Sequence, residues 1–111
     1  MDGPRHALAT VRSLAATDDF VVGHGRALAM FDDVASARSA IRAAIAGLSA
    51  LAFAHTVEMP SGPFDVYGVE REDGGWYLKL ALLQVQGRRL FVVSFHPLEF
   101  PLATSGGWVH P

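Results

Sequence analysis

The sequence predicts a single α+β domain in which N-terminal helices pack on one face of a C-terminal antiparallel meander sheet. Apolar residues recur at helical spacing up to about residue 53, and they alternate with a period of two from residue 64 onward. Half of the 111 residues are hydrophobic and only 18% are charged, so a single domain over residues 1–111 can bury a core. Helices followed by strands are typical of the α+β class.

The first half of the chain predicts two main helices. Apolar spacing favours a helix over residues 6–16, followed by a connection over residues 17–25 and a short helical piece over residues 26–31. A second helix is expected over residues 33–46, with Asp32 as its N-cap. Gly47 is expected to end that helix, and Ser49 to cap one further turn that reaches Phe53. The buried face of the second helix should comprise Val34, Ala37, Ile41, Ala44, Ile45 and Leu48.

Three strands are predicted in the second half, over residues 64–70, 76–85 and 88–96. Turns are expected at residues 71–75 and 86–87, where glycines occur. Alternation along the second and third strands predicts which side chains share a face. The polar set Tyr77, Lys79, Ser94 and His96 should lie on the open face, and the helices should meet Trp76, Leu78, Leu80, Leu82, Phe91, Val93 and Phe95.

Residues 97–111 are expected to form an irregular C-terminal extension. This segment contains three prolines and the stretch Thr104-Ser105-Gly106-Gly107. Its apolar residues, expected to attach the segment to the domain, are Leu98, Phe100, Leu102 and Trp108.

Charge and cysteine content exclude several classes of function. The chain has no cysteine, which rules out disulfides and thiol catalysis. The net charge of −2 argues against a strongly electrostatic nucleic-acid binder, so an RNA enzyme would have to focus its positive groups in one cleft. No stretch reaches the roughly 18–20 apolar residues of a membrane span, and the N-terminal residues lack a signal pattern. We therefore expect a cytoplasmic protein with no membrane association.

Two histidines bracket the strand region and point to acid–base chemistry. His55 precedes the predicted strands, and His96 ends the last one. Histidine titrates near neutral pH, so two histidines beside Tyr77 and Lys79 suit the cleavage of a phosphodiester without a metal. Neither a His-x₃-His nor a His-Glu-x-x-His spacing occurs, and no glycine-rich loop precedes a helix. We therefore expect no metal site and no cofactor.

Five short segments carry a resemblance to a known family. They are Gly47-Leu48-Ser49, Phe53, Asp65-Val66-Tyr67, Tyr77-Leu78-Lys79 and Val92-Val93-Ser94-Phe95. In order and nearly in spacing, the chain resembles the motility quorum-sensing regulator (MqsR) toxins over about residues 4–96. These toxins are RelE-like endoribonucleases of toxin–antitoxin pairs. The resemblance implies a RelE-like fold, metal-independent cleavage of mRNA and a cognate antitoxin, and it leaves open whether the ribosome must present the mRNA.

The resemblance assigns roles to individual residues. The positions of two family lysines fall on His55 and His96, and the family tyrosine falls on Tyr77, so these three residues are the expected catalytic set. Lys79, in register with Tyr77, is expected to bind the substrate phosphate, and Ser94 to form a further hydrogen bond to the substrate.

The chain also departs from the family pattern. Both catalytic lysines are replaced by histidine, a glutamine is replaced by Phe64, and an aspartate is replaced by Ala52. The histidines can indicate a better acid–base pair, because lysine must be strongly perturbed to act as a base at neutral pH. They can also indicate a catalytically inactive relative that binds RNA, or that binds a protein through a patch of Leu98, Phe100 and Trp108. We favour the first interpretation, because both substitutions introduce the residue type that improves proton transfer.

Overall fold

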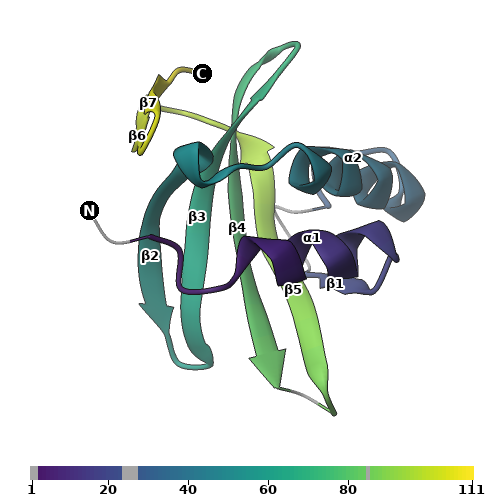
Figure 1. Ribbon diagram of the computed structural model, residues 1–111. Coiled ribbons are helices and arrows are strands. Elements are labelled where there is room, and N and C mark those ends of the chain that lie inside the picture. The colour runs from purple at the N-terminus through teal and green to yellow at the C-terminus, as the bar shows by residue number, and fades with distance from the viewer. Residues whose placement is uncertain (1–2, 24–27, 85) are drawn as a thin grey trace.

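The computed structural model describes residues 3–23, 28–84 and 86–111 and has an α+β fold with two sheets (Figure 1). The predicted α+β class is confirmed. In chain order the elements are α1 (Leu8–Ala16), β1 (Phe20–Val22), α2 (Val34–Ala46), the 3₁₀ turn η1 (Ala50–Ala52), β2 (Phe53–Met59), β3 (Gly62–Arg71), β4 (Gly74–Gln84), β5 (Arg88–Pro97), β6 (Leu102–Thr104) and β7 (Gly107–Val109).

The two α-helices lie close to their predicted positions. The N-cap of α2 is Asp33 rather than Asp32, because the carboxylate of Asp33 accepts a hydrogen bond from the backbone N–H of Ser36 at 2.7 Å. Gly47 ends α2 and Ser49 caps η1, both as predicted. Val34 was wrongly placed in the buried face, since it lies in the first turn and is 55% exposed. No helix covers residues 28–31, and residues 26–27, the start of the expected helical piece, lie outside the described part of the chain.

The main sheet has five strands in the order β1-β5-β4-β3-β2, and it is mixed rather than purely antiparallel. β1 pairs in parallel with β5, whereas the other neighbours form an antiparallel meander. The all-antiparallel prediction was therefore wrong. β1 lies within the segment predicted as a connection, and its three residues are too few for alternation to be visible in the sequence.

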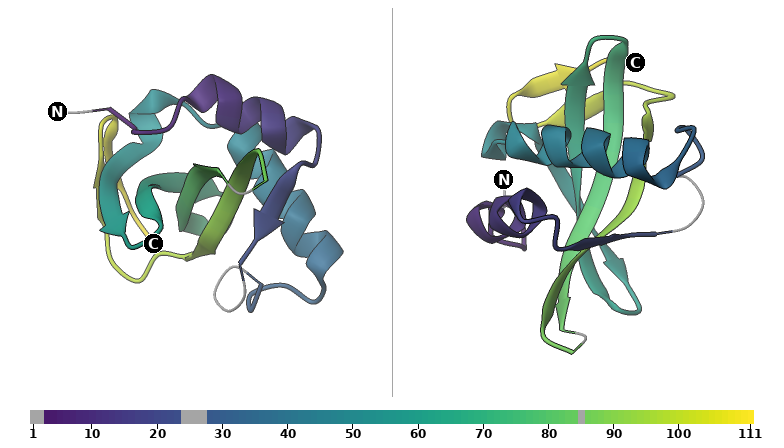
Figure 2. Two further views of the ribbon diagram at one scale, coloured as in Figure 1. Left: turned by 90° about the horizontal axis from the view of Figure 1, so that it is seen from below. Right: turned by 90° about the vertical axis from the view of Figure 1, so that its right-hand side faces the viewer.

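Both helices pack on one face of this sheet, as predicted (Figure 2). The buried core between helices and sheet includes Val11, Ala15, Ile41, Ile45, Leu48, Phe53, Tyr67, Leu78, Leu80, Leu90, Val92 and Phe95. Two arginines of α2 attach the start of β1 to the helix. Arg38 and Arg42 contact the Asp18 carboxylate at 3.0 and 2.9 Å, and the Arg38 guanidinium lies 4.1 Å from the centre of the Phe20 ring.

A β-bulge in β5 changes which of its residues face the helices. Lys79 pairs with Ser94 and the next residue, Leu80, pairs with Val92, so Val93 is an extra residue in β5. Before the bulge the core positions are Leu90 and Val92, and after it the core position is Phe95. The prediction that Phe91 and Val93 face the helices was therefore wrong, because strict alternation cannot include an inserted residue.

The C-terminal extension is more regular than predicted. After β5 the chain runs along the side of the sheet away from α1, and it ends in the β6–β7 hairpin (Figure 2). The backbone N–H groups of Ser105 and Gly106 donate to the carbonyl oxygens of Phe53 and Leu51 at 2.8 and 2.7 Å. The expected attachment residues also need correction. Leu98 is buried, but Phe100 and Trp108 are 74% and 63% exposed, and the second buried residue is Val109.

Candidate active site

The open face of the sheet brings together the four polar residues predicted from alternation. Tyr77 of β4 is directly opposite His96 of β5, and Lys79 is directly opposite Ser94. Residues paired across neighbouring strands point to the same face of a sheet. Because the helices cover the other face, this quartet lies on the side of the sheet that they leave open.

Within the quartet, the His96 ring is held in place by a stacking contact and a hydrogen bond. It is 9% exposed, and its ring stacks on Tyr77 with ring centroids 5.1 Å apart and planes inclined by 13°. The Pro97 carbonyl oxygen accepts a hydrogen bond from Nδ1 of His96 at 2.8 Å. A carbonyl can only accept, so Nδ1 carries a proton and Nε2 is the nitrogen that can gain or lose one. This arrangement holds the ring in one orientation and leaves Nε2 as the nitrogen for proton transfer.

The C-terminal extension turns this part of the open face into a groove of about 490 Å³. One wall is the polar quartet on β4 and β5, and the other is the chain from Leu98 to Leu102. The volume falls within the range of roughly 300–1,000 Å³ that small ligands occupy in proteins. The groove is therefore large enough for a nucleotide, and its sheet wall offers an imidazole, a phenol, an ammonium and a hydroxyl.

His55 lies on the open face but outside this groove. Phe53 pairs with Tyr67 and His55 pairs with Val66, so Ala54 is an extra residue in β2. Without this bulge His55 would share the face of Phe53, which is buried under the helices. Val66 in turn pairs with Lys79, so His55 continues the row of Lys79 toward the edge of the sheet.

The structure does not bring the two predicted catalytic histidines together. β3 and β4 separate the strands of His55 and His96, and three strand spacings of about 4.8 Å amount to roughly 14 Å. His55 lines a separate hollow with residues such as Arg5 and Glu58. The expectation that both histidines act on a single phosphate therefore needs correction, because sequence order gave no measure of the distance across the sheet.

Asp65, which the resemblance also matches, has a structural role. Its buried carboxylate accepts hydrogen bonds from the backbone N–H groups of Arg5 and His6 at 3.0 and 2.9 Å, and from the Thr56 hydroxyl at 2.8 Å. These contacts attach the segment before α1 to β2 and β3. A buried carboxylate with three hydrogen-bond donors has the partners it needs, and no substrate is required to explain it.

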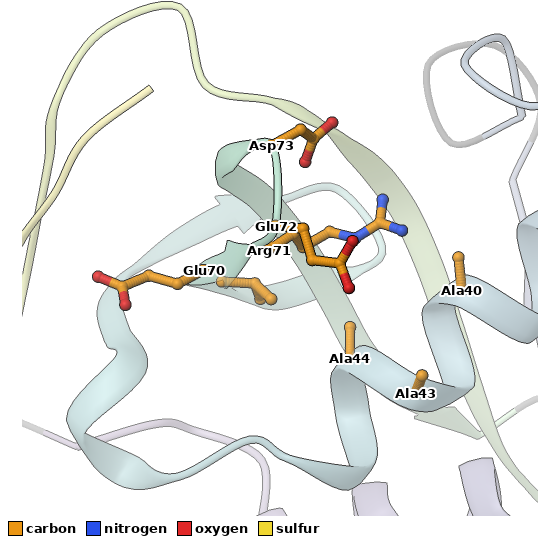
Figure 3. A pocket seen from close by; sticks show the side chains of 8 residues that line it. Ala40, Ala43, Ala44, Glu70, Arg71, Glu72 and Asp73 are labelled. Carbon is orange, nitrogen blue, oxygen red and sulfur yellow. The ribbon is translucent and has the colours of Figure 1, made fainter.

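A larger hollow, of about 660 Å³, lies away from the polar quartet, between α2 and the β3–β4 hairpin (Figure 3). Alanines of α2 form one side, and Glu70, Glu72, Asp73 and Arg71 form the other. The Arg71 guanidinium lies 4.3 Å from the centre of the Trp76 ring, within the aromatic core. Three carboxylates at its rim oppose the binding of a polyanion, so we assign the candidate site to the groove instead.

One titratable residue of the groove was missed by the sequence analysis. Glu99 lines the groove beside the quartet, and it also lines a smaller hollow that His96 borders as well. It follows the last predicted strand, where alternation no longer indicates the direction of a side chain. Its position three residues after His96 was the only available signal.

No protein-family model matches the chain, and comparisons with curated proteins and with solved structures found no match. Within residues 3–23, 28–84 and 86–111, no helix is long and apolar enough to cross a membrane. Across the same residues, no three histidine, aspartate or glutamate side chains are arranged to hold a metal ion.

Proposed function

We propose that the protein is an endoribonuclease that cleaves RNA by acid–base catalysis with its own side chains. The observation that carries this proposal is the polar quartet, with Tyr77 paired to His96 and Lys79 paired to Ser94 along one wall of a groove. In this reaction the ribose 2′-hydroxyl attacks the adjacent phosphorus and the bond to the 5′-oxygen breaks. A base, an acid and a cation are needed at one phosphate.

The quartet supplies several of these functions. His96 would protonate the leaving 5′-oxygen through Nε2, since Nδ1 is engaged with the Pro97 carbonyl. Lys79 would hold the phosphate oxygens, and Tyr77 and Ser94 would orient the phosphate by hydrogen bonds. His55, at the edge of the same face, would contact the RNA beyond the cleaved phosphate.

We extend the proposal to a toxin that cleaves mRNA in the cytoplasm, inhibits translation and growth, and is held inactive by a cognate antitoxin. The support for this extension is the resemblance of the matched segments to MqsR toxins. Two of these segments, Tyr77-Leu78-Lys79 and Val92-Val93-Ser94-Phe95, contribute residues to the quartet. An α+β domain with helices on one face and the polar set on the other agrees with a RelE-like architecture. The net charge of −2 favours RNA that the ribosome presents, because free RNA would be attracted only weakly.

A catalytically inactive regulator that binds protein or RNA is the alternative function. Two exposed aromatic residues of the C-terminal extension, Phe100 and Trp108, favour it. Leu98 does not belong to such a patch, because it is buried.

The deciding experiment incubates purified protein with a defined mRNA in EDTA, with and without translating ribosomes. We expect wild type to leave a 2′,3′-cyclic phosphate, and His96→Ala to cleave about 10²- to 10⁴-fold more slowly. His55→Ala should lose less activity than His96→Ala. Intact RNA under both conditions would reject the nuclease and favour the regulator.

A further inference from the structure

Among the described residues, His96 is the one histidine that lines the groove, so the proposed reaction needs another proton acceptor. Attack of the 2′-hydroxyl on phosphorus and departure of the 5′-oxygen occur on opposite sides of the phosphate, so the base and the acid must be different groups. His55 is three strands from His96, roughly 14 Å in the direction across the sheet, and it lines a different hollow. Among the residues that line the groove, Glu99 is the one carboxylate.

The backbone around Glu99 is fixed beside His96. The Leu98 N–H donates to the Gly75 carbonyl oxygen at 2.9 Å, and the Leu98 side chain is 8% exposed. Pro97 pairs with Trp76 at the end of the sheet. Glu99 therefore follows two residues that are attached to β4, and it borders His96 in two adjoining hollows.

The chemistry of the groove distinguishes the roles of the two groups. A carboxylate is ionised near neutral pH and can accept a proton, whereas a protonated imidazole can donate one. Lys79, which lines the same groove, supplies a positive charge that can hold a phosphate beside a carboxylate. Glu99, Lys79, His96 and Tyr77 are the titratable groups that line the groove.

We propose that Glu99 is the general base of the ribonuclease and that His96 is its general acid; this inference rests on the proposed function. The Glu99 carboxylate removes the proton of the 2′-hydroxyl as the 2′-oxygen bonds to phosphorus. The bond between phosphorus and the 5′-oxygen breaks, and His96 Nε2 gives its proton to that oxygen. The products are a 2′,3′-cyclic phosphate and a 5′-hydroxyl, and solvent returns the proton from Glu99 to His96.

The test compares two substrates that share the nucleoside 3′-phosphate at which cleavage occurs. One is a short RNA, and the other is the 4-nitrophenyl ester of the nucleoside 3′-phosphate, whose leaving group departs without protonation. Glu99→Gln should lower kcat about 10²- to 10⁴-fold on both substrates, because both need the base. His96→Ala should lose as much on RNA but recover most of its activity on the ester.

A matched control and a binding assay separate a catalytic role from a structural one. Glu72→Gln, which removes an exposed carboxylate at the β3–β4 hairpin, should cleave like wild type. Glu99→Gln should bind an uncleavable 2′-deoxy oligonucleotide at least as tightly as wild type, so its loss should appear in kcat and not in substrate affinity.

The outcomes also separate this inference from the proposed function. If wild type cleaves RNA and Glu99→Gln is equally active, the role of Glu99 as the base is overturned, but the proposed ribonuclease function is not. Recovery of Glu99→Gln on the ester would do the same. Failure of wild type to cleave either substrate, with and without ribosomes, would overturn both.

Discussion

One extra residue in each of two strands decides which side chains face the groove. Ala54 in β2 allows Phe53 to enter the core while His55 reaches the open face. Val93 in β5 allows Val92 and Phe95 to share the core while Ser94 remains beside Lys79. Bulges often occur next to functional sites, where they redirect side chains.

The contacts of the Asp18 carboxylate predict how the stability of the fold changes at low pH. Its hydrogen bond to Arg38, together with the charges of Arg38 and Arg42, lowers the pKa of Asp18 below its ordinary value. A carboxyl group whose pKa is lowered by folding stabilises the fold at pH values above its pKa in the unfolded chain, which is about 4. This stabilisation is lost as the pH falls through its pKa in the folded chain. Asp18→Asn should lower Tm at pH 7, and the difference from wild type should shrink below about pH 4.

Thermal unfolding followed by circular dichroism between pH 2.5 and 7 measures this difference. Asparagine suits the position because Asp18 has a φ of 61°, which asparagine also tolerates. A Tm difference that stays constant down to pH 2.5 would contradict the assigned ion pairs.

The burial of the Tyr67 hydroxyl predicts how the stability of the fold changes at high pH. It is buried, and it has no hydrogen-bond partner within the described residues. Burial and the nearby charge of Asp65 raise the pKa of Tyr67 above its ordinary value of about 10. The unfolded chain therefore ionises first, and wild-type stability should fall as the pH rises above about 10.

Tyr67→Phe removes both effects. Urea unfolding at pH 7 should give a free energy of unfolding that equals that of wild type or exceeds it by about 1 kcal/mol, since an unsatisfied buried hydroxyl is costly. The advantage of the variant should grow between pH 9 and 11. A clear loss of stability at pH 7 would indicate that the hydroxyl has a partner, for example a buried water.

Among the elements, the C-terminal extension has the largest influence on the site. Its residues 98–102 form one wall of the groove, and its final residues dock on the sheet at Gly75. The Gly75 N–H donates to the His110 carbonyl oxygen at 2.8 Å. A β-carbon on Gly75 would overlap that oxygen and would lie 2.7 Å from Val109.

Gly75→Ala should therefore displace the extension. We expect the free energy of unfolding to fall by about 1–3 kcal/mol, as for other overpacked sites, and RNA cleavage to fall at temperatures where the variant is folded. The control is Gly47→Ala. Its added β-carbon would lie 4.0 Å from the nearest atoms, the carbonyl oxygens of Ala43 and Ala44, and the φ of −90° at this position suits alanine. Equal losses in both variants would argue against docking at Gly75.

For the whole molecule, the distribution of positive charge predicts the salt dependence of RNA binding. Of the nine lysines and arginines, Arg5, Arg38, Arg42 and Arg89 lie within 4 Å of carboxylates, whereas Lys79 is the one lysine or arginine among the described residues that line the groove. Each phosphate contact with a single strand contributes a slope of about −0.7 to log K against log salt concentration. We expect a shallow slope near −1 for wild type.

Lys79→Gln should reduce that slope to nearly zero, whereas Arg88→Gln, at the exposed β4–β5 hairpin, should leave it unchanged. Fluorescence anisotropy with an uncleavable oligonucleotide between 25 and 300 mM salt measures both. A steep slope that survives Lys79→Gln would place the RNA on another surface.

The sequence by itself determined the α+β class, the helices on one face of the sheet, and the quartet of Tyr77, Lys79, Ser94 and His96. These predictions rest on local periodicity and on pairing across a short hairpin, which the order of residues encodes directly. The chemical proposal also began with residue types that the sequence displays.

Only the tertiary structure decided the rest. Parallel pairing of β1 with β5, the separation of His55 from His96 and the docking of Leu98, next to Glu99, at Gly75 all depend on contacts between distant segments. A bulge shifts alternation by one residue without a clear sequence signal, and a strand of three residues shows too little of its period to be recognised. The groove exists because residues 98–111 return to the sheet, and their docking at Gly75 and the start of β2 has no local pattern.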